Sequence, residues 1–468
     1  MKNISKKVYG FLFMVAIVFG VCANIFQSIE TMEWGLLFLC CAVSIFCFDK
    51  FYEKIVLFLF LVSVFTFQVV KLLLGFFMNE SDWNFGMNNR DTLIVQNIIF
   101  LTILCLVLGF TFDSKYKIKI KTQKKPLLTK VVDEKFNIVK IQNISLIIYL
   151  ISLTITIIFN FKKAVYALSN GYLSLYTSFS QSAFASRFQL IYTAAFFICM
   201  AAYPSKKRMR FYLITGSLLP ILSLIQGTRG GFVCYVFFLF FYLYEYEDIL
   251  HLRITNIKRK KKFYFWCCIG VIATLFIVPF LYSYGHTRSN QEYIVSTSLL
   301  DGIKNFLFEQ SNSMQLIKYA VIYKGELPQQ FYSLGDFADR FMGTVYPSQS
   351  VDKAMLSHSF GDAISYRVAS IGYLRGVGLG SSYLAEVYYD FGYAGILIVN
   401  FCLGIFFHRS MCWEKSGVVK NAVFFFVFYY ILLIPRSALV YPINNLLSSS
   451  VVVTFIFVFF FSYKRKIK

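Results

Sequence analysis

The chain has 468 residues, of which 57% are hydrophobic and only 15% are charged, and its net charge is +22. Apolar runs recur along its whole length, which excludes a soluble globular protein and indicates a polytopic membrane protein. The excess of lysine and arginine does not indicate nucleic-acid binding, because these residues concentrate in a few short loops between apolar runs. That placement is typical of cytoplasmic loops, which also suit contact with anionic membrane lipid.

Apolar windows of about twenty residues predict an all-α chain with about twelve transmembrane helices, within a range of eleven to thirteen. The first window follows a short basic segment without a small-residue cleavage site, so it is interpreted as a retained span. The expected spans are 8–26, 34–48, 55–77, 94–113, 143–161, 187–203, 211–227, 231–246, 263–284, 383–407, 421–435 and 446–462. With this count all basic loops fall on one side and both termini are cytoplasmic.

These spans divide the chain into three parts. About nine spans lie within 1–284, a large extracytoplasmic loop covers 285–382, and about three spans lie within 383–468. A loop of that length is expected to fold and to carry function. Its segment 301–323 has apolar residues near helical spacing, which predicts an amphipathic helix on the membrane or over a cavity. A second short helix is expected just before Pro347.

Three outer-face arginines are candidates for holding a phosphate through the planar fork of the guanidinium group. Arg229 lies in the turn "QGTRGGF", and Arg367 and Arg375 precede the glycine-rich turn "GVGLGSS". Exposed backbone N–H groups at such a turn before a helix suit a bound pyrophosphate. The alternatives are arginines that snorkel to lipid headgroups and a turn that serves only as a hinge. The glycine-rich turn includes Gly376, Gly378, Gly380 and Ser381.

Two histidines, His286 and His358, lie in the expected outer loop, where each is a candidate general base or phosphate partner, or an inert surface histidine. Glu386 and Asp390 are four residues apart, so they share one helical face where a span begins. They either lie among wet headgroups or line a polar cavity. Lys71, inside the third span, either snorkels outward or pairs with a carboxylate in a cavity.

Aromatic residues gather beside these carboxylates. Tyr388 and Tyr389 belong to a membrane-interface belt or stack on sugar rings. The sequence holds no HExxH, no CxxC and no Asp-x-Asp in an outer loop, so no metal site and no cofactor is expected.

The stretch "SSYLAEVYYDFGYAGILIV" and the turn "QGTRGGF" resemble the Wzy family of oligosaccharide repeat-unit polymerases, which build O-antigen and capsular polysaccharide. The family pattern has a glycine–serine turn, an Ala-Glu-x-Tyr helix start and a Phe-Gly-Tyr-x-Gly stretch. Here these fall at 378–382, 385–388 and 391–395. Arg367, followed eleven positions later by Gly378, fits a further pattern of the family's outer loops.

The resemblance implies a GT-C-like helical architecture in the inner (cytoplasmic) membrane. It also implies transfer of a growing glycan from undecaprenyl pyrophosphate onto the next lipid-linked repeat unit, at the outer leaflet and without a nucleotide sugar. A chain-length regulator and a flippase are further partners that it suggests. The three arginines would then bind the pyrophosphate, and His358 or Glu386 would accept the proton of the attacking sugar hydroxyl. Alternatives are an O-antigen ligase-type enzyme and a transporter of lipid-linked oligosaccharide.

Overall fold

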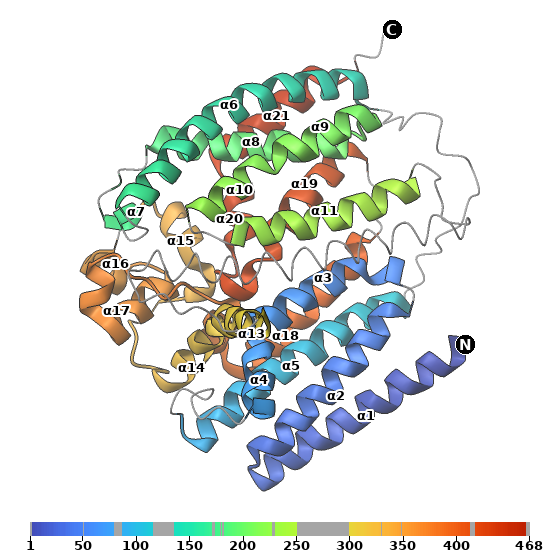
Figure 1. Cartoon of the computed structure of the whole chain (residues 1–468), viewed down its shortest axis with the longest axis vertical. Coiled ribbons are helices and arrows are strands. Elements are labelled where there is room, and N and C mark those ends of the chain that lie inside the picture. Colours follow the sequence, from blue (N-terminus) through green and yellow to red (C-terminus); the bar gives the residue numbers. More distant parts are fainter. Residues whose placement is uncertain are drawn as a thin grey trace. The chain divides into compact units, whose positions relative to one another are not determined.

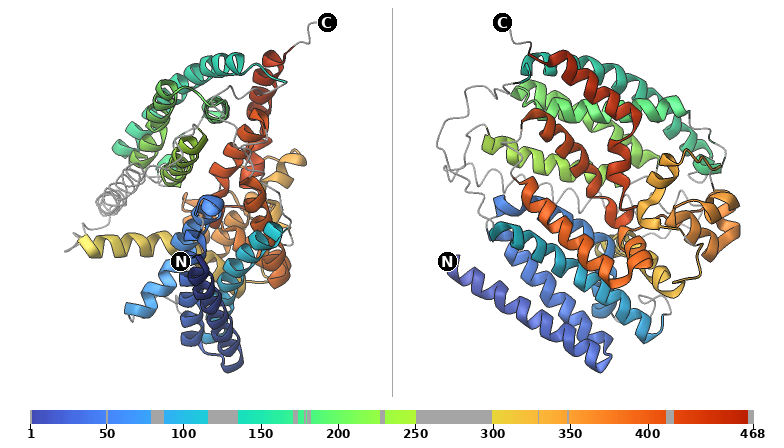
Figure 2. Two further views of the ribbon diagram at one scale, coloured as in Figure 1. Left: turned by 90° about the vertical axis from the view of Figure 1, so that its right-hand side faces the viewer. Right: turned by 180° about the vertical axis from the view of Figure 1, so that it is seen from behind.

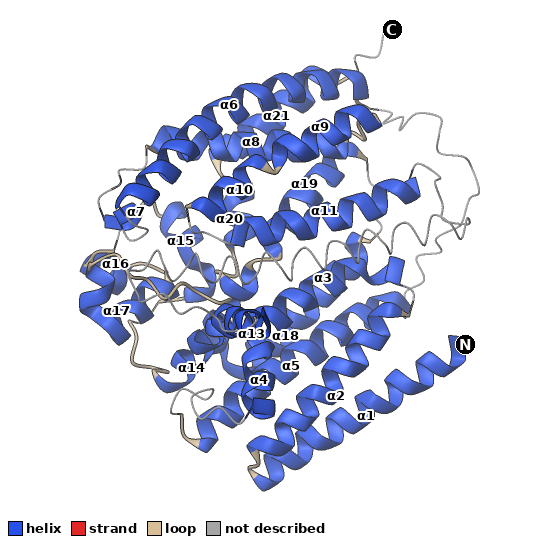
Figure 3. Ribbon diagram, in the orientation of Figure 1, coloured by secondary structure: helices blue, strands red, loops and turns tan. Residues whose placement is uncertain are grey.

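The computed structural model describes residues 2–49, 51–78, 87–115, 135–170, 174–177, 179, 182–226, 230–249, 299–328, 330–347, 349–411 and 417–464. Over these residues the chain is almost entirely helical (Figure 3), and the one extended pairing is an isolated bridge between Phe136 and Tyr463. The expected all-α class is therefore confirmed.

Nine helices in the described residues are long and apolar enough to cross a membrane. They are Ile4–Phe26, Ile29–Phe48, Ile55–Phe77, Asn89–Phe112, Ile138–Asn170, Ala183–Ala201, Lys206–Ile225, Tyr383–Ser410 and Val418–Arg436. Two shorter apolar helices, Gly230–Tyr244 and Ser449–Ser462, overlap two further expected spans. The expected span 263–284 lies outside the described residues. The chain is thus a polytopic helical membrane protein, whereas the GT-C-like arrangement and the division at 284 and 382 stay predictions.

The chain forms two compact units, of which the first comprises Met1–Ile120, Leu307–Cys412 and Ile431–Tyr441. Its α-helices (Figure 1) are α1 (Lys2–Phe26), α2 (Ile29–Phe48), α3 (Ile55–Val64), α4 (Val70–Met78), α5 (Asn89–Lys115), α14 (Met314–Ile322), α15 (Gly335–Phe341), α16 (Val351–Leu356), α17 (Phe360–Leu374) and α18 (Tyr383–Ser410). Short 3-10 segments are η1 (Phe51–Lys54), η4 (Ser311–Ser313), η5 (Tyr332–Leu334) and η7 (Ile434–Arg436), and η2 (Phe65–Val69) is a π-helical turn.

Helices α1 and α2 form a hairpin whose two arms lie side by side in all views (Figures 1 and 2). The turn is set by Gln27, which has a left-handed φ of 52°, and by Ser28, the N-cap of α2. The Ser28 hydroxyl accepts a hydrogen bond of 3.3 Å from the Thr31 amide, which satisfies one N–H group that the helix start leaves without a partner.

The π-helical turn η2 connects the third span to three other segments through hydrogen bonds to Ser311, Ser382 and Pro435. A π-helical turn frees backbone groups from the regular helical ladder. Here the Thr66 carbonyl accepts a 2.7 Å hydrogen bond from the Ser311 hydroxyl at the start of the loop helices. The buried Gln68 amide donates to the Pro435 carbonyl and, at 3.2 Å, to the Ser382 hydroxyl just before α18.

The described part of the segment 285–382 is largely helical, as the sequence predicts for 301–323 and for the residues just before Pro347. The expected helix over 301–323 forms as α13 (Leu299–Gln310), η4 and α14. The expected short helix before Pro347 forms as α15. Helices α16 and α17 begin at the N-cap serines Ser350 and Ser359, whose hydroxyls accept backbone N–H groups of the first turns.

Helix α18 crosses α5 at two glycines, and its helical geometry is broken near its N-terminal end. The α5–α18 crossing is so close that backbone touches backbone at Gly109 and Gly404. Near the start of α18, Gly392 adopts φ 60° and ψ −147°, values that only glycine adopts readily, and this breaks the helix. The segment 383–391 therefore stands as a short helix of its own before the apolar remainder of the span.

The second unit comprises Lys121–Phe306, Trp413–Tyr430 and Pro442–Lys468. Its helices are α6 (Ile138–Asn170), α7 (Ser174–Thr177), α8 (Ala183–Ala201), α9 (Lys206–Gly216), α10 (Leu218–Ile225), α11 (Gly230–Ile249), most of α13, α19 (Val418–Ile431), α20 (Tyr441–Leu446) and α21 (Ser449–Ser462). Aromatic side chains fill its interior. Phe197 of α8 packs edge to face on Phe238 of α11, at 4.9 Å between ring centroids, and on Phe426 of α19 at 5.9 Å.

Candidate functional site

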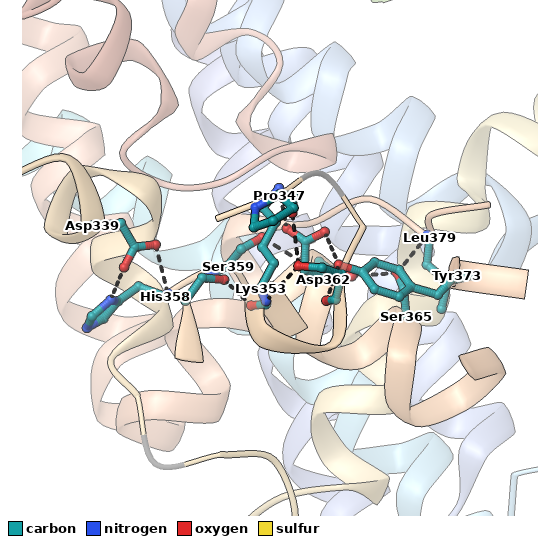
Figure 4. Close-up of polar contacts among 12 residues, drawn as sticks. Asp339, Pro347, Lys353, His358, Ser359, Asp362, Ser365, Tyr373 and Leu379 are labelled. Carbon is teal, nitrogen blue, oxygen red and sulfur yellow. Dashed lines mark hydrogen bonds and ion pairs between the residues drawn. The ribbon is translucent and has the colours of Figure 1, made fainter. Parts of the chain in front are cut away.

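The strongest candidate for acid–base chemistry is His358, which pairs with the buried Asp339 of α15 (Figure 4). The His358 ring Nδ1 lies 2.7 Å from one carboxylate oxygen of Asp339, and the His358 backbone N–H donates to the other at 3.0 Å. A carboxylate accepts hydrogen bonds, so Nδ1 carries a hydrogen, and in the neutral imidazole the lone pair then lies on Nε2. Nε2 has no partner among the described residues. A fixed imidazole that presents Nε2 is the arrangement a general base requires.

A second polar network joins the two helices on either side of His358 (Figure 4). Asp362 of α17 forms a 3.0 Å ion pair with Lys353 of α16 and accepts a 2.9 Å hydrogen bond from the Tyr373 hydroxyl. Burial, followed by the charge of Asp362, raises the pKa of Tyr373 well above its ordinary value, so the phenol stays protonated as a donor. This network fixes α16 against α17 and thereby the backbone at His358.

Glu386, an expected catalytic carboxylate, is buried and engaged by the protein itself. One carboxylate oxygen accepts a 2.6 Å hydrogen bond from the Ser381 hydroxyl, and the other accepts a 2.9 Å hydrogen bond from the Leu439 backbone N–H. The structure thus joins two of the predicted site residues, Ser381 and Glu386, in one contact. Through these hydrogen bonds Glu386 holds the start of α18 against the segment after η7, which is a structural role.

Replacing Glu386 by glutamine is therefore expected to leave the activity of the protein within about tenfold of the native level. The glutamine oxygen can accept from the Leu439 N–H, and its amide can donate to the Ser381 hydroxyl. Glu386→Ala, in contrast, leaves the partly buried Leu439 N–H without this acceptor and is expected to destabilise the protein by about 1–3 kcal/mol. The activity and the thermal unfolding of both variants separate the two roles, since a catalytic carboxylate tolerates neither change.

The next residues of α18 hold the loop segment 324–333. The Tyr388 ring lies under the Lys324 ammonium group, 4.6 Å from the ring centroid. The Tyr389 hydroxyl accepts from two backbone N–H groups, those of Gly325 at 3.2 Å and Leu327 at 2.9 Å.

Asp390 continues this contact. Its carboxylate accepts from the N–H groups of Tyr332 at 3.2 Å and Ser333 at 2.7 Å, at the start of η5. In the described structure Asp390 is therefore a carboxylate that caps a short helix. Glu386 and Asp390 do share one face of α18, but each binds backbone.

The two described arginines of the predicted pyrophosphate site differ in their surroundings. Arg367 forms a 2.7 Å ion pair with Glu326 and lies over the Tyr323 ring, although both charged side chains remain half exposed. Arg375 ends α17 with an exposed side chain that makes no hydrogen bond or ion pair with a described residue.

The glycine-rich turn after Arg375 is fixed in place. Gly376 and Gly380 have φ values of 99° and 80°, which other residues adopt only under strain. The Leu379 N–H donates to the Ser365 hydroxyl at 2.9 Å, and the Gly380 carbonyl rests on Gly361, where a Cβ atom would come within 2.6 Å of it. A turn tied to α17 at two points is no loose hinge. The exposed N–H groups of Gly378 and Gly380 bind no described residue.

Arg229 and His286 lie outside the described residues. Lys71 is buried, where its ammonium group donates to the Asn312 side chain at 3.1 Å and lies 4.0 Å from the Phe308 ring centroid. The described residues contain no cluster of three His, Cys, Asp or Glu side chains placed to hold a metal ion. Asp339 is a site residue that the sequence did not predict. It lies 19 residues before His358, and no recognisable motif connects the two.

The fold and this site define a polytopic helical membrane protein whose polar residues are gathered on a folded loop beside a span. Residues 8–466, nearly the whole chain, match the model of the family described as O-antigen polysaccharide polymerase Wzy. The chain therefore belongs to this family, and it is a membrane polymerase of O-antigen repeat units, broadly a glycosyltransferase. No curated protein and no solved structure matches it.

Proposed function

We propose that the protein transfers a growing glycan from undecaprenyl pyrophosphate onto a hydroxyl of the next lipid-linked repeat unit, at the outer leaflet of the cytoplasmic membrane. The observation that carries the proposal is the pairing of His358 with Asp339, because the reaction needs a base for the acceptor hydroxyl. Family membership supplies the class of substrate.

The proposed step uses His358 as the general base. His358 Nε2 takes the proton of the acceptor hydroxyl while the hydroxyl oxygen attacks the anomeric carbon of the donor sugar. The bond from that carbon to the pyrophosphate oxygen breaks, and undecaprenyl pyrophosphate leaves with the bonding electrons. Asp339 is a positioning residue, since it holds Nδ1–H and stabilises the imidazolium that forms.

Arg375 is the described arginine best suited to the leaving pyrophosphate. Its exposed side chain precedes a turn whose Gly378 and Gly380 N–H groups are also exposed. A guanidinium group and backbone N–H groups together can hold the charge that develops on the pyrophosphate. Arg367 would contact the pyrophosphate only after its ion pair with Glu326 breaks. Arg229, outside the described residues, keeps the role its turn predicts.

Replacing Arg375 by alanine is expected to slow polymer formation by about 10- to 100-fold, the loss of one charge-assisted contact to the leaving group. Arg375→Lys is expected to recover part of the rate, because the charge remains while the planar fork is lost. The matched control is Arg208→Ala, which removes an exposed arginine of α9 outside the loop that carries Arg375. Equal ladders from Arg375→Ala and the native protein would remove Arg375 from the site.

The experiment that tests the function is reconstitution in liposomes. The purified protein receives a lipid-linked repeat unit without any nucleotide sugar, and products are separated on a gel. A ladder supports the polymerase reaction. Transfer of a single unit to another acceptor would favour a ligase, and movement of the lipid across the bilayer without a ladder would favour a transporter.

A further inference from the structure

The two most exposed large apolar side chains in the described residues lie in the outer loop and not on a membrane span. They are Val345, at 92% exposure, and Phe341, at 87%, and Met342 between them is also exposed. Residues 341–345 are called here the apolar tip. Water-exposed apolar residues clustered in this way mark an interaction site, because leaving them in water is costly.

The tip is held by a rigid turn at the end of α15. The Thr344 N–H donates to the Asp339 carbonyl at 3.0 Å, and the Gly343 N–H donates to the Arg340 carbonyl at 3.2 Å. Gly343 has φ 71°. This pair of hydrogen bonds around a left-handed glycine is a Schellman motif, which ends a helix in one defined conformation. Phe341, Met342 and Val345 are therefore exposed by a fixed turn.

The apolar surface of this loop continues onto a membrane span. Phe331, just before η5, stacks on Phe391 of α18 at 6.4 Å between centroids, and both rings are more than half exposed. Leu334, at the end of η5 and one residue before α15, is exposed as well. Exposed apolar side chains thus continue along the chain from the contact with α18, at Phe331, to the tip.

We propose that the apolar tip inserts into the outer leaflet of the membrane and contacts its lipid acyl chains. Large apolar side chains on a fixed turn gain free energy when they leave water for the acyl-chain boundary. The occupant is inferred to be the leaflet because Phe331 stacks on Phe391, an exposed residue of a helix that is long and apolar enough to cross a membrane.

The proposed insertion has a consequence for the candidate site. Asp339 supplies both the backbone carbonyl that fixes the tip and the carboxylate that holds His358. Lipid contact at the tip would therefore set the height of the imidazole relative to the membrane. That consequence rests on the proposed function, whereas the lipid contact itself does not.

The test uses the full-length protein in lipid nanodiscs without substrate. The chain has 11 cysteines, so thiol labelling is not selective. An environment-sensitive fluorescent amino acid is instead placed at position 345 by codon suppression, and in a second variant at position 342. Position 398, where Ile398 is exposed on the α18 span, is the lipid-facing reference, and exposed Asp352 of α16 marks the water-facing reference.

The readout is the loss of fluorescence caused by nitroxide-labelled phospholipid and by aqueous iodide. Insertion predicts that the probes at 345 and 342 are quenched by the lipid nitroxide as at 398, and that iodide quenches them far less than at 352. Quenching by iodide as strong as at 352 overturns the proposal. Shielding from both quenchers would mean that a second protein copy covers the tip. Lipid quenching that begins only when polyprenyl lipid is added would assign the tip to the carrier chain. Each of these last two results would also overturn the proposal that the apolar tip inserts into the leaflet.

Discussion

Replacing His358 by alanine is expected to slow polymer elongation by roughly 10²–10⁴-fold, the usual contribution of a positioned general base. The imidazole is held at Nδ1 by the buried Asp339 carboxylate, and its Nε2 has no partner among the described residues. Alanine removes the acceptor for the hydroxyl proton but leaves the backbone hydrogen bond to Asp339 in place. The measurement is the rate of ladder growth in proteoliposomes at saturating lipid-linked repeat unit.

Two further variants identify the source of the effect. Asp339→Asn keeps the shape of the pair but removes its charge, so it is expected to lower kcat while the KM for the lipid-linked unit stays close to native. The control for loss of a histidine is His408→Gln, in the last turn of α18, where the ring packs on Phe110. Native elongation by the His358→Ala protein, at equal amounts in the membrane, would show that another group accepts the proton.

Most of the helices could be predicted because a membrane span leaves a strong signal in sequence. Apolar runs near twenty residues mark the spans, and all expected spans within the described residues overlap a helix. The interruptions left no such signal. The π-helical turn at 65–69 lies inside 55–77, which the sequence predicts as one span, and its cause is tertiary, since Ser311 binds the Thr66 carbonyl that the turn exposes. The break at Gly392 depends on a single glycine whose φ no pattern reports.

The candidate site could be predicted only in part. His358 was visible because histidines are rare on the expected outer loop, but its partner Asp339 is brought to it by the fold of α15. For the carboxylates of α18, spacing correctly placed both on one face. It gave no indication of what that face contacts. Glu386 binds the Leu439 N–H and Asp390 binds the start of η5, and both partners are backbone groups that carry no residue-specific signature.

Replacing Gly404 by leucine is expected to prevent stable folding, at a cost of about 3 kcal/mol or more. A Cβ atom at Gly404 would lie 2.3 Å from the Leu106 carbonyl oxygen, and one at Gly109 would lie 2.1 Å from that of Phe401. These contacts are with backbone, which cannot move aside as a flexible side chain can. Close approach through small residues is a principal source of helix association in membranes, so the substitution separates α5 from α18. The measurement is thermal unfolding in detergent, followed by fluorescence-detected size exclusion.

The matched control is Gly10→Leu in α1, where an added Cβ atom meets nothing within 4 Å. Both variants gain the same side chain in a membrane helix, so a difference between them reports the crossing and not helix propensity. The crossing also supports the site, because the start of α18 is tied to the part of the helix near the crossing. The Tyr383 hydroxyl donates to Asn400 at 2.7 Å, and Asn400 lies four residues before Gly404. If the Gly404→Leu protein unfolds at the same temperature as the Gly10→Leu protein, the close contact of α5 and α18 does not exist in the membrane. In that case the positions of Glu386 and Asp390, which depend on the position of α18, are no longer supported.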